Sequence, residues 1–379
     1  MKLTIKREPF LAAFGKVAQV VPNRASLEAW AKVRMECGSD GCLIHANGGE
    51  LAISCKPEGV TVHEPGSCLL PPKEFVAILR ESRVDELHID EKDAKIVITS
   101  GRDKFTILAQ PDKGEFGKPP AFPRDQLVVL DGSHFADALK AALIAAGDGG
   151  KWAYNSVCVS LRGGYIYCVG MDGGIVNRGA VPVSSIIREP LAQWPLLSVR
   201  GARQVASIAE LGHSLIAADA SKFYFEQGAY TLSSALVEGR YRDWVKTVGQ
   251  VEAAMADSPT CEIPAEEFRR AVRRAKISCG EDTLGIDLSF TVGMLTMAAA
   301  GQGGDSEVKL PVSFMDDDIS LRLHSERLLA AISLIEDEEV LTIRLKDDKP
   351  PVWFSTANGF LSLVMPLETD KPEGRATNA

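Results

Sequence analysis

One order of predicted elements, a strand, a helix and three more strands, occurs three times along this chain of 379 residues. In the first copy, a short apolar strand leads to Pro71 and Pro72, which can open a helix with Phe75, Ile78 and Leu79 on one apolar face. Three segments of alternating apolar and polar residues follow and are predicted to be strands. The three copies are residues 68–110, 196–236 and 321–367. The apolar helix faces of the second and third copies are Val205, Ile208 and Leu211, and Leu328, Ile332 and Ile335.

A further strand and helix precede each copy and complete a domain-sized repeat. They lie in residues 2–22, 127–147 and 260–279 and carry Phe10, Phe135 and Phe268 at the same place. Because the repeat is roughly 125–130 residues long, each copy can form a complete domain. Each domain would hold two helices packed on antiparallel sheet, which is an α+β fold. We expect domains at 1–124, 125–251 and 252–367, and a disordered tail at 368–379.

The composition is that of a globular protein, with 45% hydrophobic and 25% charged residues. No apolar run reaches the length of about 18 residues typical of a membrane span. The N-terminal segment alternates charged and apolar residues, unlike a signal peptide. We therefore expect a cytoplasmic protein with no membrane contact. The net charge of −9 argues against nucleic-acid binding, unless the basic residues gather on one surface.

Eight cysteines are present, and none forms a C-x-x-C pair or lies at metal-ligand spacing from a histidine. Cys158 and Cys168 flank a Gly163-Gly164 hairpin turn, but counting outward from that turn pairs Cys168 with Val159. The two thiols are then predicted to point to opposite faces of the sheet. We interpret all eight cysteines as small buried hydrophobic residues.

Basic residues gather on the helix predicted in residues 264–279. Arg269, Arg273 and Lys276 follow i, i+4, i+7 spacing and therefore share one face. A cationic stripe on an otherwise acidic protein suits the phosphates of a nucleic acid. The alternative is a solvated helix face that pairs with acidic residues in the first turn of the same helix.

Four sequence blocks, in order along the chain, resemble one known family. They read HEPGSCLLPPKEF, SGRDKFTI, ALVEGRYRDW and VMPL, and the N-terminal MKLTIKRE is close to the opening strand of that family. Over nearly its whole length the chain is similar to the bacterial sliding clamp, the beta subunit of DNA polymerase III. That family also has a threefold internal repeat, which the residues of this chain indicate independently.

The resemblance implies a head-to-tail homodimer that closes a ring around double-stranded DNA. Two inward helices per domain would present basic side chains to phosphates without reading bases, so that the ring slides and acts as a DNA polymerase processivity factor. An acidic exterior would repel DNA. By similarity, the DNA-facing residues are Arg24, Lys73, Arg80, Lys140, Arg200, Arg203, Arg269, Arg273 and Lys276.

The resemblance also implies a seam between an edge strand of the first domain, here residues 102–108, and one of the third, here 304–311. The seam residues would be Arg102, Lys104, Ile277, Asp305 and Glu307. Opposite charges across the paired strands favour this register over pairing between identical strands. The alternative is two ordinary solvated strands.

A pocket between the second and third domains is implied as well, where the replicative polymerase, the clamp loader and repair polymerases would dock short peptides. The corresponding residues are Lys151, Tyr154, Met171, Gly173, Gly174, Ile175, Val176, Arg242, Thr247, Pro351, Leu363 and Met365. The apolar floor formed by Leu363 and Met365 is the part that this chain keeps.

The entrance of this pocket departs from the family pattern. The family usually has His-Arg-Leu where this chain has Gly174, Ile175 and Val176. Its usual proline is replaced by Arg242, and its usual valine by Thr247. We therefore predict weaker binding of a standard clamp-binding peptide. The tail after residue 367 begins beside the pocket, and we expect it to screen or partly occupy the groove.

An enzyme is the competing class of protein, and the common catalytic motifs are missing. The sequence contains no G-x-x-x-x-G-K-[ST], no H-E-x-x-H and no G-x-S-x-G. Asp316, Asp317 and Asp318 precede a predicted strand without a second ligand cluster, which indicates a solvated turn. We predict a non-catalytic protein with no cofactor and no metal. The remaining alternative is a diverged clamp paralogue that acts as a protein-binding scaffold or as a specialised clamp with altered partners.

Overall fold

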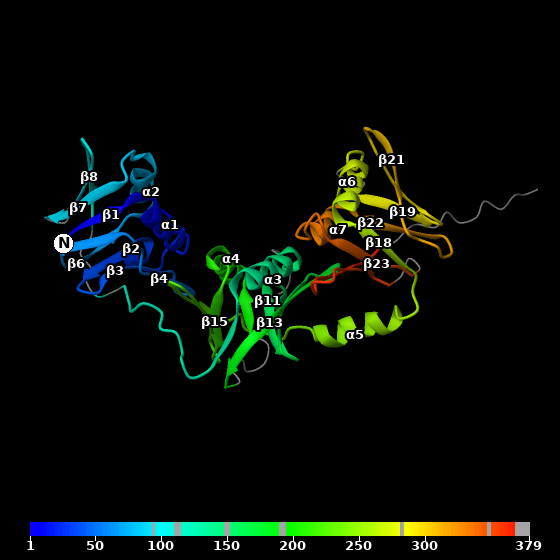
Figure 1. Cartoon of the computed structure of the whole chain (residues 1–379), viewed down its shortest axis with the longest axis horizontal. Helices are drawn as coiled ribbons and strands as arrows, with labels where there is room; N and C mark the ends of the chain where they lie inside the picture. The colour runs from blue at the N-terminus through cyan, green and yellow to red at the C-terminus, as the bar shows by residue number, and fades with distance from the viewer. Residues whose placement is uncertain are drawn as a thin grey trace, which may run out of the picture. The chain divides into compact units, whose positions relative to one another are not determined.

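The computed structural model describes residues 1–92, 95–109, 114, 116–147, 152–188, 195–280, 284–346 and 350–367. The chain divides into two compact units, Met1–Ala136 with Pro182–Val237, and Asp137–Val181 with Glu238–Ala379 (Figure 1). The expected domain 1–124 lies in the first unit and 252–367 in the second, whereas 125–251 is shared between them. The three domain boundaries stay a prediction.

The predicted order of elements is present in all three copies. The first copy is β6 (Gly66–Leu70), α2 (Pro72–Glu81), β7 (Glu86–Lys92), β8 (Lys95–Ser100) and β9 (Asp103–Leu108). The second is β14 (Leu196–Ser198), α4 (Val199–Ile208), β15 (His213–Ala218), β16 (Lys222–Gln227) and β17 (Tyr230–Ala235). The third is β22 (Ile319–His324), α7 (Ser325–Ile332), β23 (Val340–Arg344), β24 (Val352–Ser355) and β25 (Leu361–Val364). The threefold α+β repeat is therefore confirmed.

A strand and a helix precede each copy, as expected. They are β1 (Lys2–Lys6) with α1 (Arg7–Ala18), β10 (Leu127–Asp131) with α3 (Gly132–Ala145), and β18 (Thr260–Pro264) with α6 (Ala265–Lys276). Phe10, Phe135 and Phe268 have no exposed surface. The repeated phenylalanine thus marks the core side of each helix.

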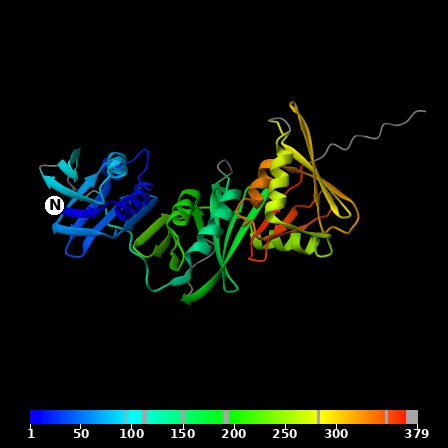
Figure 2. The same ribbon diagram turned by 45° about the horizontal axis from the view of Figure 1, so that its top comes forward.

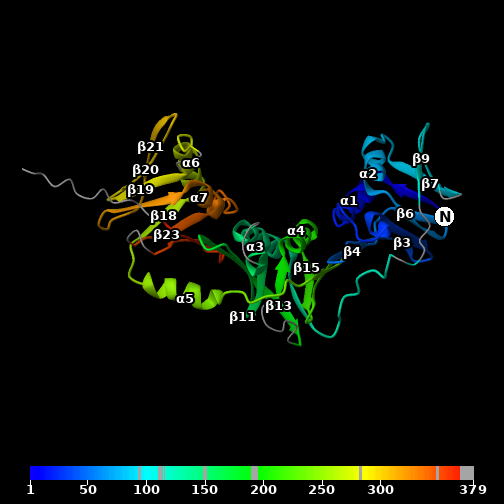
Figure 3. The same ribbon diagram turned by 180° about the vertical axis from the view of Figure 1, so that it is seen from behind.

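The first unit is built on antiparallel sheets. One has the strand order β5 (Val60–Glu64), β1, β7, β8 and β9. The other runs from the end of β13 (Ile175–Ile187) through β10, β15, β16, β17, β4 (Leu51–Cys55), β3 (Gly41–Asn47) and β2 (Val33–Gly38) to β6. Helices α1 and α2 lie side by side (Figure 3), and the ring centres of Phe14 and Phe75 are 4.7 Å apart in their shared core.

The second unit also combines sheets with helices. One sheet has the order β18, β23, β24, β25 and β13, and β12 (Tyr165–Met171) and β11 (Ser156–Arg162) extend it. Another has the order β21 (Gly304–Pro311), β20 (Met294–Gly301), β19 (Gly285–Thr291) and β22. Helix α6 lies next to α7, β20 and β21 (Figures 1 and 2). Helix α3 approaches the sheet so closely that a Cβ atom at Gly170 would lie 1.8 Å from the carbonyl oxygen of Ala142.

Some elements differ from the sequence prediction. The apolar pattern does not predict β5, the 3₁₀ helices η1 (Glu28–Ala31) and η2 (Trp152–Asn155), or α5 (Trp244–Ala254). Leu211 is 84% exposed, so its expected place on the apolar face of α4 is wrong. The helix ends earlier because Ala209 has extended backbone angles. Ile335 lies beyond the end of α7 but is buried, as expected.

The cysteines behave largely as predicted. Cys168 pairs with Val159 in the β11–β12 hairpin, which confirms the counted register. All eight thiols are free, and seven of them are buried. Cys279 is the exception, because it is only half-buried.

Candidate functional site

Arg269, on α6, is a buried structural residue with 8% of its surface exposed. Its Nη2 donates to the carbonyl oxygen of Ile332 at 3.2 Å and to that of Ile335, and its Nη1 pairs with Asp337. The guanidinium therefore satisfies carbonyl groups at the carboxyl end of α7, where a cation is favoured. The prediction that Arg269 faces DNA is wrong, because its donors are already bound inside the protein.

The other two members of the predicted stripe reach solvent. Arg273 is exposed and forms no ion pair with any residue in the described part of the chain. The Nζ of Lys276 lies 2.6 Å from the carboxylate of Glu326, on α7, and about a third of its side chain is exposed. Arg274 is exposed beside them. The cationic surface of α6 therefore centres on Arg273 and Arg274.

The remaining residues predicted to face DNA are all exposed. They are Arg24, Lys73, Arg80, Lys140, Arg200 and Arg203. Within the chain, Lys140 lies 2.8 Å from Asp137, and Arg200 donates to the carbonyl oxygen of Val20 at 2.7 Å. Exposure is what a phosphate contact requires, and the contacts themselves stay predictions.

Strands β9 and β21 each lie at the edge of a sheet among the described strands. The charged residues predicted for the seam are all exposed, namely Arg102, Lys104, Asp305 and Glu307. Glu307 pairs with Lys309 on its own strand at 2.9 Å. Two apolar side chains near these edges are exposed as well, Leu108 at 74% and Ile277 at 81%. Because an edge strand carries unpaired N–H and C=O groups, both strands can accept a further strand.

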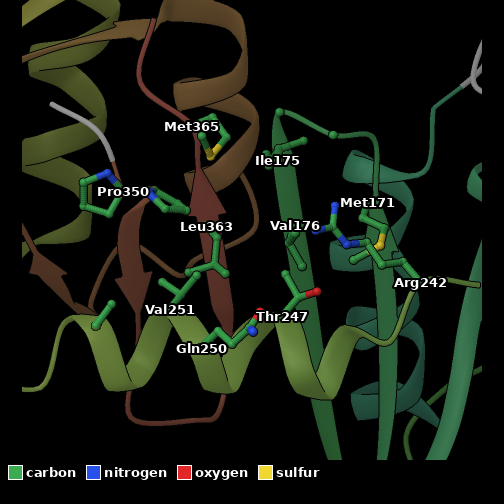
Figure 4. Close-up of a pocket in the computed structure, with 14 residues that line it drawn as sticks. Met171, Ile175, Val176, Arg242, Thr247, Gln250, Val251, Pro350, Leu363 and Met365 are labelled. Carbon is green, nitrogen blue, oxygen red and sulfur yellow. The ribbon is translucent and has the colours of Figure 1, made fainter.

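A cavity of about 480 Å³ lies in the second unit, where β12, β13, α5 and β25 meet (Figure 4). Ten of the residues predicted for the partner pocket line it, namely Met171, Gly173, Gly174, Ile175, Val176, Arg242, Thr247, Pro351, Leu363 and Met365. Lys151 lies outside the described residues, and Tyr154 is described only through its backbone, in η2. Gln250, Val251, Ala254 and Pro350 line the cavity too and are missing from the prediction.

Helix α5 supplies most of the lining that the prediction missed. Its contributions are Thr247, Gln250, Val251 and Ala254, which follow i, i+3, i+4, i+7 spacing and share one face. The Oδ1 of Asp243 accepts a hydrogen bond from the N–H of Lys246 at 2.9 Å and so caps the first turn. This capping aspartate is the signal from which the helix could have been found.

Asp172 holds the turn that forms one wall of the cavity. Its Oδ1 accepts hydrogen bonds from the backbone N–H groups of Gly174 at 2.8 Å and Ile175 at 2.9 Å. Gly173 has a φ of 95°, a left-handed conformation that glycine adopts without strain. The N–H of Met365 donates to the carbonyl oxygen of Gly174 at 2.9 Å. The Asp172 carboxylate and one backbone hydrogen bond therefore fix this wall before any ligand enters.

The floor of the cavity is apolar and well buried. Leu363 is 2% exposed, and Met171 and Ile175 are equally buried. Met365, which we expected in the floor, is 38% exposed and lies nearer the rim. The hydroxyl of Thr247 donates to the carbonyl oxygen of Asp243 at 2.9 Å, so the helix backbone already uses the polar group of this residue.

Among the residues that the structure describes, no three His, Cys, Asp or Glu side chains gather as they would around a metal ion. Asp316, Asp317 and Asp318 are exposed. Of the helices that the structure describes, none combines the length and the apolar character needed to cross a membrane.

Comparison with known proteins points to one family. Residues 1–116 match the family model of the DNA polymerase III beta subunit, N-terminal domain. The chain is 22% identical over 344 residues to the beta sliding clamp of Caulobacter vibrioides (strain NA1000 / CB15N), a match that covers 87% of this chain and 89% of that protein.

Solved structures show the same likeness over almost the whole chain. The sliding clamp from Bacillus subtilis superposes with a TM-score of 0.86 at 16% identity, over 97% of this chain and 99% of that chain. The DNA polymerase III subunit beta from Pseudomonas aeruginosa gives 0.84 at 20% identity, over 97% and 100%. The chain thus resembles the bacterial sliding clamp, the beta subunit of DNA polymerase III, in fold along nearly its whole length, and has diverged from it in sequence.

Proposed function

We propose that two copies of this chain join head to tail into a ring around duplex DNA, and that the ring acts as a processivity factor for a DNA polymerase. The observation that carries the proposal is the match of 97% of the chain to solved sliding clamps with a TM-score of 0.86. Such a protein would work on DNA in the cytoplasm. It would need no cofactor, because holding DNA inside a ring is a matter of topology.

The two edge strands support the proposed seam. β9 of one copy would pair with β21 of the other, which adds backbone hydrogen bonds between the sheets. Lys104 and Arg102 on one edge meet Asp305 and Glu307 on the other, and this charge difference disfavours pairing of a strand with its own copy. Glu307 would then exchange its contact with Lys309 for one across the seam.

The exposed cations support sequence-independent binding of DNA. Arg24, Lys73 and Arg80 in the first unit and Arg273 in the second reach solvent without an ion pair among the described residues. Phosphate contacts from such side chains hold a duplex without fixing a position along it. Binding through them would weaken steeply with salt.

The cavity beside α5 supports docking of partner proteins through short peptides. Its volume of about 480 Å³ and its buried apolar floor are typical of a site for a few apolar side chains. The replicative polymerase, the clamp loader and repair polymerases are the partners that we propose. Since Gly174, Ile175 and Arg242 differ from the usual family residues, a standard clamp-binding peptide should bind more weakly than it does to an ordinary clamp.

The seam is tested by the solution mass of matched variants. Ile277→Asp replaces an exposed apolar side chain beside β21 by a carboxylate. Leu211→Asp makes the same kind of change at an equally exposed residue away from both edge strands. We expect two-chain particles for the unaltered protein and the Leu211 variant, and one-chain particles for the Ile277 variant at low micromolar concentration. Dimers of equal stability in all three proteins would place the interface elsewhere.

A protein-binding scaffold that does not enclose DNA is the second candidate, and the altered entrance of the pocket favours it. One experiment distinguishes the two functions. Dilute protein is mixed with nicked circular plasmid and concentrated, so that any rings close around the DNA, and the sample is then treated with a bifunctional amine cross-linker and washed in high salt. A ring around DNA keeps protein on the circular plasmid and loses it once the plasmid is linearised. Equal loss from both forms would leave the scaffold as the function.

A further inference from the structure

The cavity beside α5 combines an apolar floor with one exposed cation. Leu363, Met171 and Ile175 form the buried floor. Arg242 lines the same cavity and is exposed. Figure 4 shows its guanidinium directed toward Met171 and Val176, over the start of β13. A ligand that fills the floor therefore passes within reach of this group.

Arg242 has no counter-ion in the part of the chain that the structure describes. None of the described lining residues is an aspartate or a glutamate. Asp243, the next residue, caps α5 through the N–H of Lys246. Asp172 accepts two backbone hydrogen bonds within its turn and faces a different guanidinium. Asp172 and Asp243 are thus already engaged, and the charge of Arg242 is left for a ligand.

That second guanidinium belongs to Arg327, on α7, and it lies against Gly174, which lines the cavity. Its Nη2 lies 3.8 Å from the carboxylate of Asp172. A Cβ atom at Gly174 would lie only 2.3 Å from its Nη1. Glycine at this position therefore makes room for an arginine head group. Arg242 is consequently the one charged side chain among the described residues that line the cavity, on a protein whose overall charge is −9.

We propose that the cavity selects a peptide segment of a partner protein in which a large apolar side chain, seated on the floor, lies next to an acidic side chain that pairs with Arg242. This inference rests on the proposed role of the cavity as a partner-peptide site and narrows it to acidic peptides. A guanidinium suits a carboxylate because it offers two parallel N–H donors. The neutral proline that clamps usually have at this position has no such preference.

Binding of short peptides to the full-length protein tests the selection. The probes are fluorescein-labelled octapeptides with Leu-Phe at their centre and either Glu or Gln at every flanking position, and binding is followed by fluorescence anisotropy. The Glu peptide is expected to bind about two- to fivefold more tightly, the range of an exposed ion pair. The preference should fade in 0.5 M salt, where screening is strong.

Two variants assign the preference to one residue. Arg242→Gln should bind both peptides equally, because it keeps a polar side chain of similar reach and loses the charge. Lys246→Gln removes an exposed cation four residues after Arg242, on α5, whose side chain does not line the cavity, and this variant should keep the full preference. Retained preference in the Arg242 variant, or none in the unaltered protein, would overturn this inference alone. Failure of every peptide to bind would overturn the peptide site itself.

Discussion

Replacing Arg269 by methionine should destabilise the second unit without exposing any new apolar surface. The stem of the side chain is kept, but the donors to the carbonyl groups of Ile332 and Ile335 are lost. Both of these residues are buried, so water cannot easily take over. Asp337 also loses its partner, although its side chain is 53% exposed and can be solvated again.

The magnitude follows from those groups. A buried carbonyl left without a donor costs about 1–3 kcal/mol, and the half-exposed ion pair adds little because water screens it. The carbonyl oxygen of Ile332 keeps a hydrogen bond from the N–H of Ile335, at 3.4 Å, so the carbonyl of Ile335 bears most of the loss. We expect a loss of about 1–3 kcal/mol in the free energy of unfolding for Arg269→Met. At about 3 °C per kcal/mol for a unit of this size, the melting temperature falls by about 3–9 °C.

Calorimetry of the full-length protein measures this fall, with Arg273→Met as the matched control. Arg273 lies one turn further along α6 and is exposed, so its replacement should change stability by less than about 0.5 kcal/mol. DNA binding should respond in the opposite way. Arg273→Met should weaken it and Arg269→Met should not, because only Arg273 of the two can reach a phosphate. Equal melting temperatures for the two variants would refute the structural role of Arg269.

Three further predictions concern other parts of the chain. Gly170→Ala should destabilise the second unit by about 1–3 kcal/mol, because its Cβ atom would press on the carbonyl oxygen of Ala142. Gly249→Ala, in an uncrowded part of α5, should be neutral or stabilising. Equal melting curves for the two variants would contradict the packing argument. Hydrogen bonds from Ser133 and neighbouring N–H groups hold the pKa of Asp131 at about 2, below its ordinary value. The stability that this residue contributes is therefore present above about pH 4 and lost toward pH 2. Asp131→Asn should be less stable than the unaltered protein at pH 7 and equally stable in acid, and a difference in stability independent of pH would argue against this. Deleting residues 368–379 should tighten peptide binding if the tail screens the groove, and unchanged affinity would exclude that role.

The repeat and its core could be predicted because they depend on local patterns. Alternation of apolar residues identifies strands such as β8 and β16, and the repeated Phe10, Phe135 and Phe268 identify the buried side of three helices. These signals come from side chains that pack on their own element and its neighbours.

The features that could not be predicted from the sequence depend on contacts between residues far apart along the chain. The stripe of α6 predicts that Arg269 is solvated, and only the carbonyl groups of α7, more than sixty residues away, explain why it is buried. Similarly, the sequence shows that Gly174 departs from the usual family residue, but the reason lies in Arg327, whose guanidinium occupies the space that a side chain there would need. The apolar face of helix α5 is too short to predict the helix from the sequence. The predicted pocket lining therefore lacks Gln250, Val251 and Ala254.

A closed ring of two copies of this chain is the basis of the proposed function. Negative-stain electron microscopy of the purified protein, with the solution mass measured on the same sample, would detect it. A closed ring gives particles with an open centre and the mass of two chains. Compact particles with the mass of one chain over a wide range of concentration would contradict it.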